Sequence, residues 1–132
     1  MKVEVSNGEI LDKLSILEIK LNNVKEESKL KNIGKEHATL SLVAAHIPAS
    51  PLDLYNDLKR VNQELWDIED KIRVKERNRE FDQEFIALAR SVYQTNDERA
   101  KIKKEINLHT GSNFVEEKSY EEHAKALEEA LE

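Results

Sequence analysis

Apolar residues recur along much of the chain at alternating spacings of four and three, which is the period of one face of an α-helix. The first stripe of this kind consists of Ile10, Leu14, Leu17, Leu21 and Val24. Residues 6–9, with the sequence SNGE, form a capping box, in which a serine hydroxyl and a glutamate carboxylate accept hydrogen bonds from free backbone N–H groups. The sequence therefore predicts a first helix that begins at Ser6 and ends near Ser28.

The same pattern predicts two further helices, over residues 30–45 and 51–77, on either side of a proline-containing loop. In the second helix, Ile33, Leu40, Val43 and Ala44 are expected to face inward. Ser50 is a good N-cap for the third helix, and Pro51 suits its first position. The apolar stripe of the third helix comprises Leu54, Leu58, Val61, Leu65, Ile68 and Ile72. It continues for about three heptads, which favours a coiled-coil-like contact with another helix.

A fourth helix is expected after a turn at residues 78–82, and Gly111 is expected to end it. Its apolar stripe is interrupted in the middle, where Asn96, Arg99 and Lys103 occupy seam positions. Residues 95–98 (TNDE) are a capping box at which the helix would break, but the heptad phase carries through them and favours continuity. A third capping box at residues 119–122 predicts a short C-terminal helix. Strand signals are limited to a weak alternation at residues 3–5.

These elements predict an all-α fold. We expect an antiparallel bundle of two helical hairpins, with long coiled-coil-like helices and a short C-terminal helix. A length of 132 residues fits a single domain over residues 1–132. Because the second hairpin is longer than the first, part of it is left uncovered, and a homodimer through that seam is the simplest cover.

Composition narrows the range of functions. The chain has no cysteine, which excludes disulfides, thiolate metal sites and cysteine nucleophiles. The net charge is −6, and residues 116–132 hold seven Glu against two Lys, so we expect an acidic C-terminal appendage on a nearly neutral body. A basic run at residues 71–79 is too local for a nucleic-acid partner. Without an apolar segment that fits a membrane span or a signal peptide, we expect a cytoplasmic protein with no membrane partner.

Polar residues accumulate beside the predicted seams. If the third and fourth helices fold back on each other near Glu80, facing residues have numbers that sum to about 160, which places Asp70 opposite Arg90. The candidate polar pocket comprises Glu18, Lys20, Asn62, Trp66, Glu69, Asp70, Arg73, Arg90, Asn96, Arg99 and Lys103. One interpretation is interhelical ion pairs that set register. The other is a pocket in which Arg90, Arg99 and Lys103 face an anionic ligand, because a buried arginine needs a partner.

The first helix has a similar feature. Apolar residues are spread around it, so that some of its polar residues must lie close to buried surface. These polar residues are Asp12, Lys13, Ser15, Glu18 and Lys20. We interpret them as part of an ion-pair network rather than as catalytic groups.

Familiar catalytic patterns are absent from the sequence. The four histidines lie in different segments without metal-ligand spacing, and the three glycines form no phosphate-binding loop, so we predict no metal and no cofactor. The all-helical magnesium-dependent nucleotide pyrophosphohydrolases hold their metal with carboxylate pairs, spaced three residues apart, on two neighbouring helices. Glu64 with Asp67, and Asp67 with Asp70, have this spacing on one helix, but a second pair on a neighbouring helix is missing. A chorismate-mutase-like fold agrees in length and class, although its active-site pattern does not align here.

Four segments resemble blocks of one family of small uncharacterised proteins from bacteria and phages. They are SNGEILDKLSILEIK at 6–20, VNQELWDIEDKIR at 61–73, ARSVYQTNDERAKIK at 89–103 and EEKSY at 116–120. The resemblance covers almost the whole chain but not the acidic tail after Tyr120, and it brings no established activity. Its blocks contain the polar residues that periodicity places beside the seams.

Two functions are therefore expected. The first is a non-enzymatic helical interaction or accessory protein with a protein partner. The alternative is a binder of, or an enzyme acting on, an anionic small molecule such as a sugar phosphate or a nucleotide sugar.

Overall fold

The computed structural model describes residues 1–48 and 51–115, and within them the chain forms four α-helices and no strand. The helices are α1 (Asn7–Asn23), α2 (Glu27–Ala44), α3 (Leu52–Arg77) and α4 (Gln83–Thr110). The all-α prediction is confirmed for this part of the chain, and residues 3–5 are not a strand. The predicted Ser50 cap and the predicted helix after residue 119 lie outside the described residues.

Local chemistry explains most helix ends. The Ser6 hydroxyl accepts a hydrogen bond from the Glu9 amide at 3.2 Å, which confirms the first cap. Gly111 ends α4 in the left-handed conformation, with a φ of 66°, where glycine has no steric penalty. α4 continues unbroken through residues 95–98, as predicted. α1 ends at Asn23, earlier than expected, because Val24 turns to an extended conformation.

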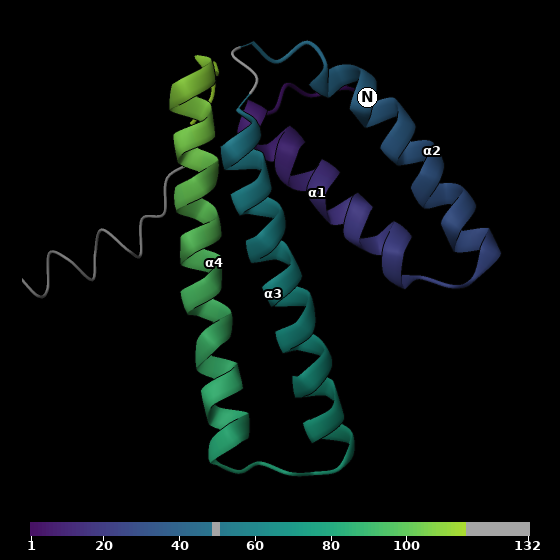
Figure 1. Cartoon of the computed structure of the whole chain (residues 1–132), viewed down its shortest axis with the longest axis vertical. Helices are drawn as coiled ribbons and strands as arrows, with labels where there is room; N and C mark the ends of the chain where they lie inside the picture. Colours follow the sequence, from purple (N-terminus) through teal and green to yellow (C-terminus); the bar gives the residue numbers. More distant parts are fainter. Residues whose placement is uncertain (49–50, 116–132) are drawn as a thin grey trace, which may run out of the picture.

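The helices pair in chain order, α1 with α2 and α3 with α4 (Figure 1). α1 also contacts both α3 and α4, whereas α2 contacts α1 alone. α1 begins beside the upper ends of α3 and α4 and then diverges from α3 (Figure 1). The isolated position of α2 explains why none of its residues is buried, including the expected inward residues Ile33, Leu40 and Val43. Ala44, at the end of α2, is half-buried and packs against the core, as expected.

The apolar core lies where α1, α3 and α4 meet. It consists of Leu11, Leu58, Val61, Ile102 and Ile106. Leu58 and Val61 come from the predicted stripe of α3 and are fully buried. Burial of each large aliphatic side chain contributes about 1.5–3 kcal/mol, so this junction is the main apolar contribution to stability.

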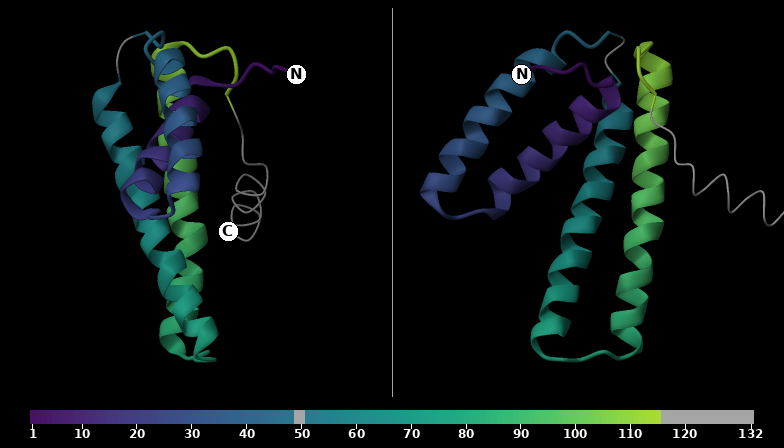
Figure 2. Two further views of the ribbon diagram at one scale, coloured as in Figure 1. Left: turned by 90° about the vertical axis from the view of Figure 1, so that its right-hand side faces the viewer. Right: turned by 180° about the vertical axis from the view of Figure 1, so that it is seen from behind.

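Beyond the core, α3 and α4 continue as a two-helix projection, which we call the arm (residues 63–94; Figure 2). Its turn is held by Lys75, whose ammonium lies 3.1, 2.9 and 3.0 Å from carboxylates of Glu80, Asp82 and Glu84. At the core end, Arg60 binds Glu98 at 3.0 Å. The Lys75–Glu84 and Arg60–Glu98 pairs have residue numbers that sum to 159 and 158, close to the expected value of about 160.

Candidate functional site

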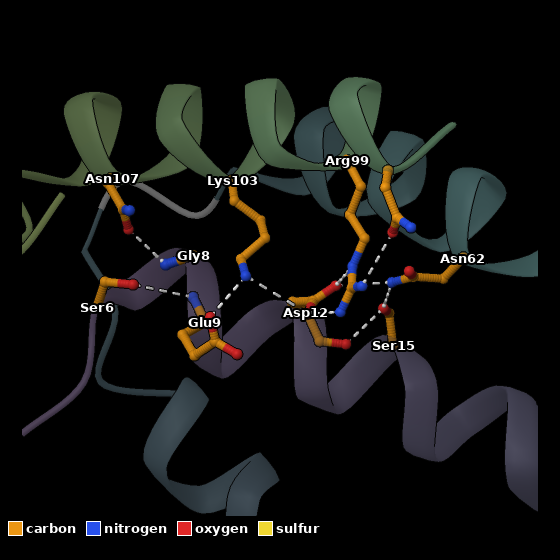
Figure 3. Close-up of polar contacts among 10 residues, drawn as sticks. Ser6, Gly8, Glu9, Asp12, Ser15, Asn62, Arg99, Lys103 and Asn107 are labelled. Atoms are coloured by element: carbon orange, nitrogen blue, oxygen red, sulfur yellow. Dashed lines mark hydrogen bonds and ion pairs between the residues drawn. The ribbon is translucent and has the colours of Figure 1, made fainter. Parts of the chain in front are cut away.

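A buried carboxylate lies at the junction of three helices (Figure 3). Asp12 of α1 is 1% exposed. Arg99 of α4 donates from Nε to Asp12 Oδ1 at 2.8 Å and from Nη2 to Oδ2. Asn62 of α3 donates to Oδ1 at 2.9 Å, and the Lys103 ammonium lies 3.8 Å from Oδ2. One side chain of α1 is therefore bound by both α3 and α4.

The neighbouring polar groups complete this arrangement. Ser15, less than one turn after Asp12, donates its hydroxyl to the Asp12 carbonyl at 2.8 Å. The same hydroxyl accepts a hydrogen bond from Asn62 Nδ2 at 2.7 Å. Buried polar groups without partners are costly, and a fully satisfied network instead favours one packing arrangement. These contacts fix the rotation of α1 on α3.

The charges of the network are balanced. Lys103 donates to Glu9 Oε2 at 2.6 Å, and its side chain is only 18% exposed. Asp12 and Glu9 thus offset the positive charges of Arg99 and Lys103. Two cations that were candidates for an anionic ligand are paired with carboxylates from α1.

Electrostatics keep Asp12 ionised. Burial alone would raise the pKa of Asp12, but hydrogen bonds from Arg99 and Asn62 outweigh burial and lower this pKa below its ordinary value. The bond to Asp12 in turn raises the pKa of Arg99. A carboxylate with a lowered pKa is a poor general acid or base near neutral pH, so the network is suited to structure rather than proton transfer.

The N-terminal end of α1 is bound to the C-terminal end of α4. The Gly8 amide donates to Asn107 Oδ1 at 2.6 Å. The Asn7 amide donates to the Ser112 hydroxyl at 3.0 Å, and Asn7 Nδ2 donates to the Thr110 hydroxyl at 2.9 Å. The first amides of a helix have no partner within the helix, and α4 with the residues that follow it supplies partners for two of them.

Gly8 permits this close approach. A Cβ at this position would lie 2.6 Å from the carbonyl oxygen of Lys103 and 2.9 Å from Asn107 Oδ1. Both distances are shorter than a van der Waals contact. The backbone of α1 therefore rests directly against α4, which positions Glu9 and Asp12 for their cations.

Stability is expected to depend on pH through Asp12. Because the folded-state pKa of Asp12 is lowered, its contribution is present above the unfolded-state pKa, near 3.9, and is lost as pH falls through the folded value. Urea unfolding between pH 6 and pH 2.5 should show this loss, at up to about 1.4 kcal/mol per pH unit for one proton. Asp12→Asn should reduce the slope of the free energy of unfolding against pH in the acid range. Asp57→Asn, an exposed change on α3, should retain it, and an equal slope in all three proteins would contradict the assignment.

The structure brings together four of the predicted pocket residues: Asn62, Asn96, Arg99 and Lys103. Asn96 joins through its side-chain oxygen, 3.5 Å from Arg99 Nη1. Glu69, Asp70, Arg73 and Arg90 are exposed on the arm, and Trp66 is half-buried there. Lys20 is half-buried in the last turn of α1.

Glu18 belongs to a second cluster, which ties α2 and α3 to α1. Its carboxylate lies 2.8 Å from Lys59 Nζ and 3.7 Å from His37 Nε2. Burial would raise the pKa of Glu18, but Lys59, Tyr55 and His37 together outweigh burial and lower this pKa. Burial and the nearby Glu18 carboxylate raise the pKa of Tyr55. This cluster is therefore a second set of interhelical contacts.

The sequence identified Asp12 and Ser15 as polar residues near buried surface but not their partners Arg99 and Asn62. It did not identify Gly8 or Asn107, although the spacing of these residues carried a signal. Gly8, Asp12 and Ser15 follow one another at intervals of four and three on α1. On α4, Asn107 follows Arg99 and Lys103 at the same interval of four. The capping box identified Glu9 as a capping residue, but nothing in the sequence predicted its bond with Lys103.

A family model for a family of unknown function, DUF6165, matches residues 1–128. The chain belongs to this family. The DUF6165 match includes every residue of the network and extends past Tyr120 into the acidic tail. No curated protein matches the chain, and no solved structure does. The function of this DUF6165 chain must therefore be argued from its geometry.

Two absences within residues 1–48 and 51–115 bear on function. No group of three or more acidic or histidine side chains in this part of the chain is arranged to hold a metal ion. No helix in it combines the length and apolar character that crossing a membrane requires.

Proposed function

We propose that this protein is a non-enzymatic helical interaction protein that presents its arm to a protein partner. The observation that carries the proposal is the burial pattern of the arm: between Asn62 and Thr95, no residue is buried. Two helices alone cannot remove their shared seam from water, and bundles do so by adding further helices. The seam of the arm is coiled-coil-like in pattern and is available for such an addition.

The surface of the arm also supports this function. Val74, Phe81, Ile86 and Tyr93 are 44–57% exposed there. Apolar and aromatic side chains at exposed positions of one projecting element are typical of protein interaction surfaces. The arm is anchored at the core by the Asp12 network, which gives its partner a fixed geometry to bind.

The anionic-ligand alternative has less support. Arg99 and Lys103 are paired with Asp12 and Glu9, and Arg90 is exposed on the arm, away from both. A ligand would have to compete with Asp12 and Glu9 for these cations.

The arm surface can be tested in extracts of the cells that produce the protein. Ile86→Ser combined with Tyr93→Ser should remove the protein from larger complexes, because both side chains are exposed and their loss leaves the core intact. Size-exclusion chromatography with immunodetection measures the change. Leu42→Ser with Val43→Ser, a matched exposed pair on α2, should elute like the wild type. Equal elution of the arm variant and the wild type would reject the proposal.

A thermal-shift panel tests the alternative directly. Ligands that bind only the folded state raise the melting temperature of a protein. The proposed function predicts no such rise when nucleotides, sugar phosphates or dicarboxylates are added to the purified protein. A dose-dependent rise that is lost in Lys103→Met would establish an anion site and would overturn the proposed function.

A further inference from the structure

One face of the arm continues the surface on which α1 lies. On α3, Trp66, Glu69 and Arg73 follow Asn62 at spacings of four, three and four, so they share its face. On α4, Tyr93, Ala89 and Ile86 precede Asn96 at spacings of three, four and three. Asn62 and Asn96 both contact the network that holds α1. We call the six residues Trp66, Glu69, Arg73, Ile86, Ala89 and Tyr93 the arm face.

No helix covers the arm face within the described chain. α1 crosses at the level of Asn62 and then diverges from α3 (Figures 1 and 2). Ile86 and Tyr93 are 46% and 53% exposed. Glu69 and Arg73 are also exposed, and their charged groups lie 3.7 Å apart. The arm face thus combines exposed apolar groups on α4 with one acidic and one basic side chain on α3.

Glu69 and Arg73 carry opposite charges and can pair with each other across a two-fold axis. A two-fold axis that crosses the arm perpendicular to its helices, at the level of residue 71, places α3 antiparallel to the α3 of a second copy. Each Glu69 then lies opposite the partner's Arg73, because their numbers are symmetric about 71. The two carboxylates and two guanidinium groups form a closed ring of alternating charge across the axis.

The same axis brings the apolar residues together. The ion pairs between α3 and α4 show that residue 71 lies level with residues 87–88 of α4. These positions lie between Ile86 and Ala89, so each Ile86 lies opposite the partner's Ala89. A single symmetry operation therefore satisfies the charged half and the apolar half of the face.

The free length of the arm also agrees with this axis. The uncovered face runs from residue 63 to the turn near residue 80, about 27 Å at 1.5 Å per residue, and its midpoint is residue 71 or 72. A second arm centred there extends from α1 to the turn. Two helices about 18–20 Å wide together would bury about 1,000 Å² in total, which is the lower limit for a specific interface.

We propose that the arm face binds the arm face of a second copy of this chain, antiparallel and two-fold symmetric, to form a four-helix bundle. The inference rests on the proposed function and names its partner. The small interface makes the dimer reversible, with a dissociation constant in the micromolar range.

The mass of the purified full chain tests the pairing first. Light scattering during size-exclusion chromatography should give twice the 15.3 kDa monomer mass at about 100 μM, far above a micromolar dissociation constant, and a decline toward 15.3 kDa on dilution. A monomer throughout this range would overturn the dimer. If the arm-dependent complexes in cell extracts persist in that case, the proposed function stands and only the identity of the partner is wrong.

Charge exchange tests the symmetry. Glu69→Arg should be monomeric because the introduced guanidinium would face the partner's Arg73, and Arg73→Glu should be monomeric because two carboxylates would meet. Mixing the two variants should restore a dimer, since every facing pair then has opposite charges. Lys71→Glu changes the charge by the same amount as Arg73→Glu on the opposite face of α3 and should leave the dimer intact.

Circular dichroism of each variant, with helix content equal to the wild type, shows that the chain is folded. Dimers of Glu69→Arg or Arg73→Glu alone, or a mixture that remains monomeric, would overturn the proposed pairing.

Discussion

Arg99→Ala is expected to lower the free energy of unfolding by about 3 kcal/mol or more. The substitution leaves the Asp12 carboxylate, which is 1% exposed, without its two strongest hydrogen bonds. An uncompensated buried charge is among the most destabilising defects in a protein. Urea denaturation followed by circular dichroism measures the change, which is large for a domain of this size.

Arg90→Ala is the matched control, because it removes an exposed arginine from the same helix. Its effect should lie within about 0.5 kcal/mol of zero. If Arg99→Ala is no more costly than Arg90→Ala, the network does not hold α1. Adding Asp12→Asn to Arg99→Ala should recover part of the loss, because the second change removes the unpaired charge, and a double-mutant cycle measures the coupling.

Gly8→Ala should destabilise the protein by about 2–3 kcal/mol. The added methyl group would lie 2.6 Å from the carbonyl oxygen of Lys103, which is backbone and cannot rotate away. α1 must then withdraw from α4, which lengthens the bond from the Gly8 amide to Asn107 and the bond from Lys103 to Glu9. Thermal unfolding, together with hydrogen exchange of the amides around Gly8, records the loss.

Gly34→Ala provides a control with the opposite sign. Gly34 lies inside α2, and no atom lies within 4 Å of a Cβ built there. Alanine favours the helix over glycine by about 1 kcal/mol, so this variant should be more stable than the wild type. Destabilisation by both substitutions to a similar extent would show that contact with α4 is not the reason that position 8 is glycine.

Much of the fold could be predicted from the sequence because helix signals are local. The capping box at Ser6, the turn before α4 and the stop at Gly111 each depend on residues within one or two turns. At residues 95–98 the capping box predicts a break and the heptad phase predicts a continuous helix, and the helix is continuous. The burial of α2 was overestimated because periodicity identifies an apolar face without showing that α1 is its single neighbour.

The site was predicted only in part, for a related reason. Asn62, Arg99 and Lys103 were identified from the seam of α3 and α4, whose relative register follows from their connecting turn. Their partners Asp12 and Glu9 lie on α1, and the crossing of α1 over the other two helices is set by tertiary packing. Periodicity gives no crossing angle, so Asp12 was expected in an ion-pair network but was not matched to Arg99, and the candidate pocket included only Glu18 and Lys20 from α1.

The separation of Asp12 from Arg99 along the chain has a consequence during synthesis. Asp12 and Arg99 are separated by 87 residues, which a ribosome adds in about 4–17 s at 5–20 residues per second. α1 and α2 can associate as soon as both have emerged, since their contacts are local. Throughout that interval the Asp12 carboxylate, which α4 later buries, remains hydrated, because its partner Arg99 has not yet been made.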